Sequence, residues 1–318
     1  MDRRKFLGSL ALLGVQGVML DAAGTIPLTI VDSEAPRRKK KKDGFDENLV
    51  VIISDLHVNP GSYQPGRLER TVNDILALRP RPRNVIALGD LAYLTGRPEE
   101  YALLKEILSP FEGTGIKLSL SMGNHDRRAN FAEAFPELAA ESLMEDRFVF
   151  VVKTPRADFI LLDSLQESPD PTTWITPGAL PDNEKEWLRS TLASYTDKPV
   201  FVTAHHPLDE IGIKEILLDS PACCGFIHGH NHIWRDGWIR KNYSERTLLR
   251  TLCVPSTGHW GDIGYTLLHL GEDQAEAGLV EYEFFFPKPL DEGEPKPAQW
   301  TMIEQERSGA QVSFAYRK

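Results

Sequence analysis

The chain has 318 residues, of which 41% are hydrophobic, and its formal net charge is −10. This length and apolar content suffice for a substantial core, so the composition predicts one main domain with appendages and excludes a low-complexity chain. The first 43 residues hold nine Lys and Arg and five Asp and Glu, which leaves a net charge of −14 on the remainder. Because nucleic-acid phosphates are bound by clustered Lys and Arg, this acidic remainder argues against a large nucleic-acid-binding surface.

The N-terminus has the features of an export signal. Arg3-Arg4-Lys5-Phe6-Leu7 resembles the twin-arginine motif, and the 15 residues from Phe6 to Leu20 are apolar except for Gly, Ser and Gln16. A membrane-spanning helix needs about 20 apolar residues, so we expect residues 1–32 to be a removed signal peptide and not a permanent membrane span. Export by the twin-arginine machinery would deliver a folded, metal-loaded protein to the periplasm or the exterior. The alternative is a disordered N-terminal arm.

Six consecutive basic residues, Arg37 to Lys42, follow the apolar segment. We interpret residues 33–47 as a solvated basic linker; the alternative is a weak tether to an anionic surface, at about 1 kcal/mol per charge. The chain also has three cysteines, Cys223, Cys224 and Cys253. Two are neighbours in sequence and all three have apolar surroundings, so we expect buried free thiols.

From residue 48 onward, strand-like runs alternate with helical patterns. Leu49 to Ser54 is a continuous run rich in β-branched residues, which predicts a buried strand, and apolar residues recur at helical spacing between Arg67 and Leu78. Further strands are expected at 84–88, 116–121, 147–153, 158–163, 200–204, 225–227, 248–254, 265–270 and 278–286, and further helices at 99–108, 130–140 and 183–192.

In the first half of the domain, most predicted strands are connected by predicted helices. In the second half, most predicted strands follow one another without a helix between them. The order therefore predicts an α/β domain over residues 48–286, in which two mixed β-sheets pack as a sandwich flanked by helices. The tail, residues 287–318, contains five apolar anchors that would be costly to leave in water, so we expect this extension to pack on the domain. The anchors are Trp300, Met302, Val312, Phe314 and Tyr316.

Polar motifs follow the ends of five predicted strands. Asp, His and Asn side chains offer the oxygen and nitrogen ligands that divalent transition metals accept, and strand-ending loops can bring them together. We therefore expect a metal site at a strand-end edge of the sandwich. The motifs are Asp55-Leu56-His57, Gly89-Asp90, Gly123-Asn124-His125-Asp126, His205-His206-Pro207 and Gly229-His230-Asn231-His232.

These motifs, in this order, resemble those of the calcineurin-like metallophosphoesterases over roughly residues 48 to 270. The resemblance implies a hydrolase in which a hydroxide bridging two divalent or trivalent metal ions, such as Mn, Fe or Zn, attacks a phosphate ester. It implies that Asp90 bridges the metals. The other implied ligands are Asp55, His57 and His232 for one metal, and Asn124, His205 and His230 for the other.

The resemblance also implies that His125 faces the substrate as the catalytic residue. It would protonate the leaving alkoxide or stabilise charge in the transition state. The alternative is that Asp126 holds the His125 ring in a purely structural role.

Differences between this sequence and the motifs of related phosphoesterase families narrow the expected class of phosphoesterase. The chain lacks the Gly-Asp-x-x-Asp-Arg-Gly motif of protein Ser/Thr phosphatases. Tyr93 matches a purple acid phosphatase ligand, but His57 already fills that position. Residues 54–136 look more like the bacterial cyclic-nucleotide and glycerophosphodiester phosphodiesterases, so a small phosphodiester substrate is slightly favoured. A phosphomonoesterase and a non-catalytic exported metal-binding protein remain as alternatives.

Residues that contact the substrate are harder to predict. His206 and the run Thr257 to Gly261 lie near strand ends and could reach a leaving group. Aromatic residues in loops cover a pocket about as often as they cap a core. The two arginines after the His125 loop could hold a phosphate oxygen or face solvent. The sequence therefore does not decide the roles of these aromatic residues and arginines, which are Tyr63, Trp174, Trp234, Arg127 and Arg128.

Overall fold

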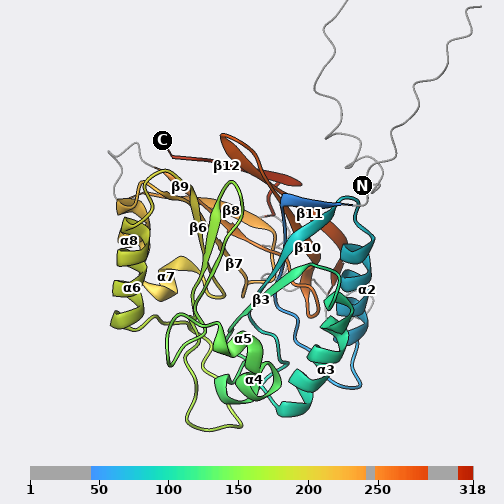
Figure 1. Ribbon diagram of the computed structural model, residues 1–318. Coiled ribbons are helices and arrows are strands. Elements are labelled where there is room, and N and C mark those ends of the chain that lie inside the picture. Colours follow the sequence, from blue (N-terminus) through green and yellow to red (C-terminus); the bar gives the residue numbers. More distant parts are fainter. Residues whose placement is uncertain (1–43, 241–247, 286–306, 318) are drawn as a thin grey trace, which may run out of the picture. The chain divides into compact units, whose positions relative to one another are not determined.

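The computed structural model describes residues 44–240, 248–285 and 307–317 (Figure 1). Its first six-stranded sheet has the order β12-β11-β10-β1-β2-β3. Strands β1, β2 and β3 are parallel, and the pairings that lead from β1 to β12 are antiparallel. The strands are β1 (Phe45–Ile53), β2 (Arg81–Leu88), β3 (Lys117–Ser121), β10 (Gly261–Leu270), β11 (Gln274–Phe285) and β12 (Gln311–Ala315).

The second six-stranded sheet has the order β4-β5-β6-β7-β9-β8. Its four central strands are parallel, and the edge strands β4 and β8 pair antiparallel with their neighbours. The strands are β4 (Phe150–Val152), β5 (Asp158–Leu161), β6 (Val200–Ala204), β7 (Cys223–His228), β8 (Arg235–Ile239) and β9 (Leu249–Cys253).

The two sheets pack face to face between two layers of helices. Ile52 of β1 shares one buried cluster with Phe201 of β6, whereas its neighbour Ile53 points to the opposite face and packs beneath the first helical layer. Figure 1 shows α2 and α3 on one side and α6 and α8 on the other, with the strands between them. This arrangement confirms the predicted sandwich of two mixed sheets. The helices are α2 (Gln64–Ala77), α3 (Pro98–Leu108), α4 (Arg128–Ala134), α5 (Pro136–Ala140), α6 (Asp182–Ala193), α7 (Leu208–Ile211) and α8 (Lys214–Asp219), with a 3-10 turn at η1 (Ser109–Phe111).

Three local expectations need correction. The helix expected over 130–140 is two helices, α4 and α5, because Pro136 lacks an N–H and disfavours a helical backbone at Phe135. Strand β8 was not expected, since its sequence contains Arg, Asp and Gly, which are uncommon in strands. Strand β1 begins at Phe45 and not at Leu49, because Phe45 already pairs with Arg81 of β2.

The C-terminal tail enters the first sheet where it is described. Strand β12 pairs antiparallel with β11, and its residues Val312 and Phe314 are buried. Phe314 contacts Phe201 edge to face, with ring centroids 5.2 Å apart. Of the expected anchors, Trp300 and Met302 lie outside the described residues.

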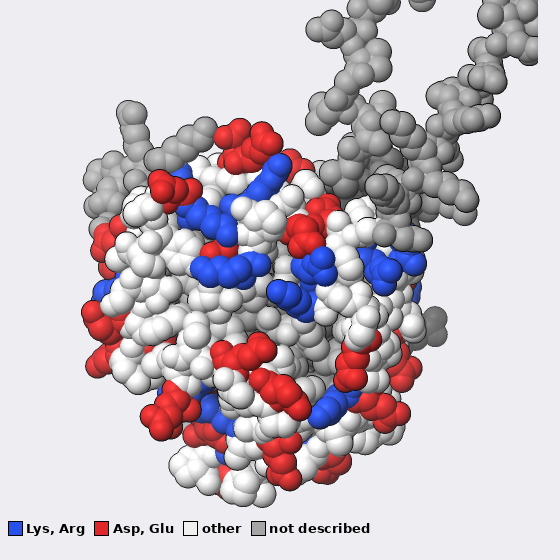
Figure 2. Space-filling model, in the orientation of Figure 1, with Lys and Arg blue, Asp and Glu red and all other residues white. Residues whose placement is uncertain are grey.

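The predicted signal peptide and the run of six basic residues lie outside the described residues. Within the part described, no helix is both long and apolar enough to cross a membrane. On the face in Figure 2, Lys and Arg side chains are interspersed with Asp and Glu side chains. The three cysteines are buried and unpaired, as expected.

Candidate metal centre and active site

All eight predicted site residues lie in loops at the carboxyl ends of parallel strands. In the first sheet, β1 leads to Asp55 and His57, and β2 leads to Asp90. The carboxyl ends of parallel strands meet at one edge, which brings loops from distant parts of the sequence together. Backbone hydrogen bonds continue the β1–β2 pairing past the strand ends, from Asp55 N–H to the Gly89 carbonyl at 3.1 Å and from His57 N–H to the Asp90 carbonyl at 2.9 Å.

Hydrogen bonds across the sandwich join the site loops of the two sheets. The His205 Nδ1, after β6, donates to the Leu88 carbonyl of β2 at 2.7 Å. The main-chain N–H of His230, after β7, lies 3.2 Å from both carboxylate oxygens of Asp55. The site therefore lies where the ends of the two sheets converge.

The site backbone is held in conformations that side-chain-bearing residues seldom adopt. Five non-glycine residues have φ between 45° and 69°. Such positions are strained and gather at functional sites, where the surrounding structure enforces them. The motif glycines allow close contacts as well, because a Cβ at Gly123 would lie 2.2 Å from the Asp90 nitrogen. The five residues are Asp55, His57, Asp90, His230 and His232.

One group of four side chains could hold a metal ion: Asp55, His57, Asp90 and His232. All four are buried, and their potential ligand atoms lie within 4.8 Å of one another. The His232 Nε2 lies 3.0 Å from an Asp55 oxygen, and the His57 Nε2 lies 3.4 Å from an Asp90 oxygen. The structure thus brings together one of the two predicted ligand sets.

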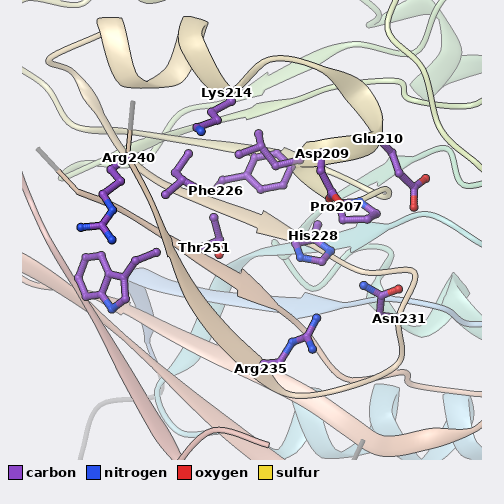
Figure 3. A pocket seen from close by; sticks show the side chains of 13 residues that line it. Pro207, Asp209, Glu210, Lys214, Phe226, His228, Asn231, Arg235, Arg240 and Thr251 are labelled. Atoms are coloured by element: carbon purple, nitrogen blue, oxygen red, sulfur yellow. The ribbon is translucent and has the colours of Figure 1, made fainter. Parts of the chain in front are cut away.

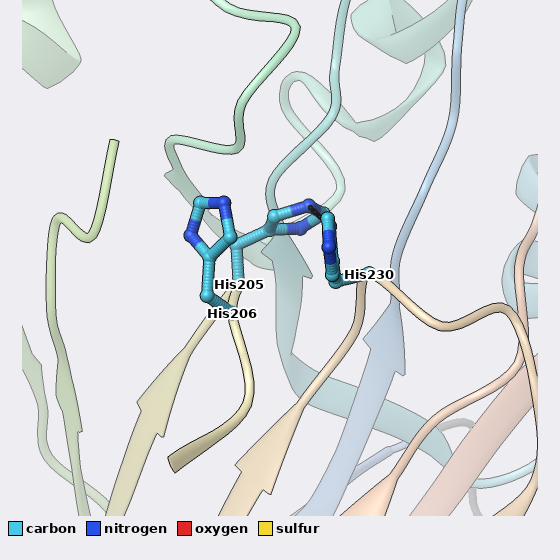
Figure 4. A group of neighbouring side chains, drawn as sticks. All are labelled: His205, His206 and His230. Atoms are coloured by element: carbon cyan, nitrogen blue, oxygen red, sulfur yellow. Dashed lines mark hydrogen bonds between the residues drawn. The ribbon is translucent and has the colours of Figure 1, made fainter. Parts of the chain in front are cut away.

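The second predicted set meets the first at Asp90. The His205 Nε2 lies 3.2 Å from Asp90 Oδ2, from Asn124 Oδ1 and from the His230 Nδ1. Figure 4 shows the rings of His205 and His230 approaching each other from separate strands, with His206 alongside. Asp90 therefore lies between the two sets, as a bridging ligand would.

Hydrogen bonding supports a cation at this point. The His205 Nδ1 donates to a peptide carbonyl, so when the ring is neutral its Nε2 presents a lone pair to the oxygens of Asn124 and Asp90. The His57 Nδ1 likewise donates to the Tyr93 carbonyl at 3.0 Å, and its Nε2 faces Asp90. Converging lone pairs repel one another unless a proton or a metal ion lies between them. The donor set of imidazole, carboxylate and amide oxygen fits a divalent transition metal.

The pKa shifts reflect the same crowding of charge. Burial alone would lower the pKa of His205, but the neighbouring carboxylates of Asp90 and Asp55 raise it to about 9. Burial opposes ionisation of Asp90 as well, yet the surrounding histidines, His205 first, hold its pKa well below the usual range. Burial lowers the pKa of His57 well below its usual value, so His57 is a neutral ring that can offer a lone pair. The Asp90 carboxylate is thus ionised, the form in which a carboxylate binds a metal.

His125 differs from the other site histidines. Its Nδ1 donates to the Leu94 carbonyl at 2.8 Å, and its main-chain N–H donates to Asp90 at 2.9 Å. Its Nε2 lies 4.0 Å from Asp90 Oδ2, farther than the His205 or His57 nitrogens, and the side chain lines the open cavity. The geometry therefore sets Nε2 of His125 farther from Asp90 than the other ring nitrogens, at the cavity over the site.

Asp126 does not hold the His125 ring, so that structural alternative is wrong. Its carboxylate instead accepts main-chain N–H groups of Leu91, Ala92 and Gly123, at 2.8 to 3.2 Å, and the Tyr101 hydroxyl at 2.9 Å. It thereby joins the Asp90 loop to the His125 loop. Sequence reasoning missed this role, although Asp126 belongs to one of the motifs.

His206 lies beside the site but is not among the residues that line the cavity over it. Its Nδ1 accepts the Ser164 hydroxyl at 2.7 Å and its Nε2 donates to the Thr176 carbonyl at 3.1 Å. Burial lowers its pKa to about 2, so the ring is neutral. His206 groups spatially with His205 and His230, but both of its nitrogens are already occupied. It packs against those two rings and orients them.

A cavity of about 450 Å³ opens over the site, and aromatic residues form its walls. Trp174 is 42% exposed and its ring centroid lies 5.1 Å from that of His125. His259 and Trp260 line the opposite part, so the run after β9 does reach the site as expected. Trp234, by contrast, is a fully buried core residue.

The two arginines after the His125 loop neither face solvent nor line this cavity. Arg127 donates to the carbonyls of Ser168, Asp170 and Thr173, and so holds the loop that carries Trp174. Arg128 forms a two-pronged ion pair with buried Asp163, with both N···O distances at 2.8 Å. The sequence could not reveal these contacts of Arg127 and Arg128, because the loop that they bind lies about 40 residues further along the chain.

The family model for calcineurin-like phosphoesterases matches residues 49–234, and the chain belongs to this family. A glycerophosphodiester phosphodiesterase from Enterobacter lignolyticus is 30% identical over 183 residues, which cover 55% of this chain and 62% of that protein. A probable cyclic nucleotide phosphodiesterase from Rhodococcus erythropolis is 28% identical over 213 residues, covering 64% and 65%. The matched stretches thus span less than two thirds of these relatives.

A solved structure supports the fold. A dimetal phosphatase from Danio rerio superposes with a TM-score of 0.57 at 14% identity, covering 73% of this chain and 95% of that one. At this identity the likeness concerns the fold alone.

Proposed function

We propose that this chain is a metal-dependent phosphodiesterase. The observation that carries the proposal is the convergence of His205 and His57 on the Asp90 carboxylate, with Asn124 beside His205, beneath a cavity that His125 lines. Relatives named as glycerophosphodiester and cyclic nucleotide phosphodiesterases support a diester substrate.

The proposed metal ligands are those expected from the sequence. Asp55, His57 and His232 would hold one cation, and Asn124, His205 and His230 a second, with Asp90 shared. Bound divalent cations, such as Mn, Fe or Zn, would polarise the phosphate and make an attacking water more acidic. The carbonyls of Leu88 and Tyr93 fix which nitrogen of His205 and of His57 carries the lone pair.

His125 is proposed as the general acid. Its Nδ1–H is held by the Leu94 carbonyl, so only Nε2 can donate a proton to a leaving alkoxide at the mouth of the site. Trp174 packs beside the ring and would exclude water from that side of the leaving group. These residues therefore supply proton transfer and shielding.

Two alternatives to a phosphodiesterase are a phosphomonoesterase and a protein that binds metal without catalysis. A panel of matched esters distinguishes them. Purified protein loaded with Mn²⁺, Zn²⁺ or Fe²⁺ should hydrolyse bis-p-nitrophenyl phosphate at a higher kcat/KM than p-nitrophenyl phosphate. The reverse preference would favour the monoesterase, and no hydrolysis of either ester with any metal would favour the non-catalytic protein.

We further propose that the protein is exported by the twin-arginine pathway to the periplasm or the cell exterior. The support is the sequence Arg3-Arg4-Lys5-Phe6-Leu7 followed by the apolar run to Leu20. Replacing both Arg3 and Arg4 by Lys should retain the protein in the cytoplasm with its activity intact. Unchanged export of this variant would contradict the proposal.

A further inference from the structure

A second cavity adjoins the candidate active site. Its volume is about 720 Å³, and Asn231 and Arg235 line both this cavity and the one over the metal-ligand groups. Its floor is the outer face of the second sheet, where Phe226, His228 and Thr251 lie (Figure 3). A molecule bound at the metal-ligand groups could therefore extend into this space.

Cationic side chains line the cavity. Lys214 comes from the start of α8, Arg235 from the start of β8 and Arg240 from the residue after β8. Figure 3 shows Lys214 and Arg240 on the side away from Glu210 and Asn231. The Lys214 ammonium makes no hydrogen bond or ion pair with any residue of the described ranges. Lys and Arg side chains arranged in this way are suited to phosphate or carboxylate groups.

Two acidic residues, Asp209 and Glu210, also line the cavity. The Glu210 carboxylate accepts the Gly178 N–H at 2.9 Å and lies 4.0 Å from the His230 Nε2. The negative charge of Glu210 therefore lies where the second cavity meets the metal-ligand groups. An anionic group in the cavity would avoid that boundary and lie towards Lys214 and Arg240.

We infer that this second cavity binds an additional phosphate or carboxylate group on one arm of the substrate. The inference rests on the proposed function, because it requires that the scissile phosphodiester lies over the Asp90 site. It assigns the substrate class: a diester in which one ester arm carries an additional negative charge. The neutral or aromatic arm would then lie against Trp174.

Matched probes can test this assignment. The p-nitrophenyl ester of thymidine 5′-phosphate would be compared with the same ester carrying a 3′-phosphate or a 3′-O-succinyl group. We expect the metal-loaded protein to show a five- to tenfold higher kcat/KM on the charged probes, mainly through a lower KM. The 3′-phosphate and 3′-succinyl arms distinguish a phosphate site from a carboxylate site. Equal kcat/KM on all three probes would overturn the inference.

Variants at Lys214 provide the residue-level test. Lys214→Gln should lower kcat/KM by five- to tenfold on the probes with a 3′-phosphate or 3′-O-succinyl group, and by less than twofold on the probe without either group. Lys214→Glu should have a larger effect of the same kind. The matched control is Lys185→Gln, on the neighbouring helix α6 and outside the cavity, which should change neither value. Equal losses from the Lys214 and Lys185 variants would overturn the inference.

A binding measurement distinguishes failure of this inference from failure of the proposed function. Calorimetric titration with thymidine 3′,5′-bisphosphate needs no turnover, and Lys214→Gln should raise its Kd by five- to tenfold. If binding depends on Lys214 but no probe is hydrolysed, the proposed function fails and the anion site stands. If the probes are hydrolysed but Kd is the same in both proteins, the anion site is wrong and the phosphodiesterase stands.

Discussion

The Nδ1 of His125 donates a hydrogen bond to the main-chain carbonyl of Leu94 at 2.8 Å. Because a carbonyl can only accept, this contact keeps a proton on Nδ1, so the proton that a general acid gives up must be carried on Nε2 of the doubly protonated ring. His125 also lines the cavity over the site. A general acid needs this combination of a held ring and one available nitrogen.

The first prediction concerns His125→Ala. Because His125 is not among the proposed ligands, metal content should stay near that of the wild type. We expect kcat to fall by about 10² to 10⁴ on a diester with an alkyl leaving group such as glycerophosphocholine, which needs protonation. The loss should be smaller on p-nitrophenyl esters, whose leaving group needs little protonation. Elemental analysis and steady-state kinetics check both parts. Equal losses on both substrates, or loss of metal, would show that His125 is a ligand or a structural residue.

The second prediction concerns the link between the site loops. The buried Tyr101 hydroxyl donates to Asp126 and accepts the Arg127 N–H at 2.8 Å. Tyr101→Phe leaves that N–H without its partner, so the free energy of unfolding should fall by about 1 to 3 kcal/mol. Urea denaturation measures this. Tyr63→Phe, at a half-exposed position, is the control and should cost less than about 0.5 kcal/mol.

The third prediction concerns the loop that carries Trp174. Arg127→Ala removes donors to three backbone carbonyls, so amide hydrogen exchange across residues 166–176 should become faster. KM for diesters with an aromatic arm should rise, because Trp174 is no longer held beside His125. Trp174→Ala should raise the same KM without changing the exchange rates. Unchanged exchange in Arg127→Ala would show that the guanidinium does not order this loop.

The fourth prediction concerns stability and pH. Burial, and then the Asp163 carboxylate, raise the pKa of Glu184 from 4.5 to about 8, against the opposing effect of Arg128 and Arg147. The folded state thus keeps a proton that the unfolded state loses above pH 4.5, so Glu184 lowers stability progressively as pH rises from about 4.5 to 8.

Replacing Glu184 tests whether its carboxyl group lowers stability as the pH rises. Relative to the wild type, Glu184→Gln should gain about 1 to 4 kcal/mol in free energy of unfolding between pH 5 and pH 8. Urea denaturation at the two pH values measures the difference. Glu186→Gln, an exposed position on the same helix, should show no such gain. A variant whose stability tracked the wild type at both pH values would mean that Glu184 titrates normally.

The metal-ligand groups could be predicted from the sequence because each motif is local and follows a strand. Once β1, β2, β6 and β7 are recognised, parallel pairing within each sheet brings Asp55 beside Asp90 and His205 beside His230, and the packing of the two sheets brings the two pairs together. The two-sheet fold was predictable for a similar reason, since its buried strands are continuous apolar runs.

Roles that depend on distant partners could not be predicted. His206 resembles its neighbour His205 in sequence, but Ser164 and Thr176 occupy its nitrogens. Trp234 looks like a loop residue, yet it is buried in the core beneath the C-terminal strand. The break between α4 and α5, by contrast, is signalled locally by Pro136.

The most direct test of the proposed function is the metal-dependent rate of bis-p-nitrophenyl phosphate hydrolysis, measured before and after chelation and after metal is restored. Activity should be lost on chelation and recovered with a divalent transition metal. The variant Asp90→Asn, which removes the negative charge between the two ligand groups, should recover neither metal nor rate. Hydrolysis that survives chelation, or full activity and metal content in Asp90→Asn, would contradict the proposed function.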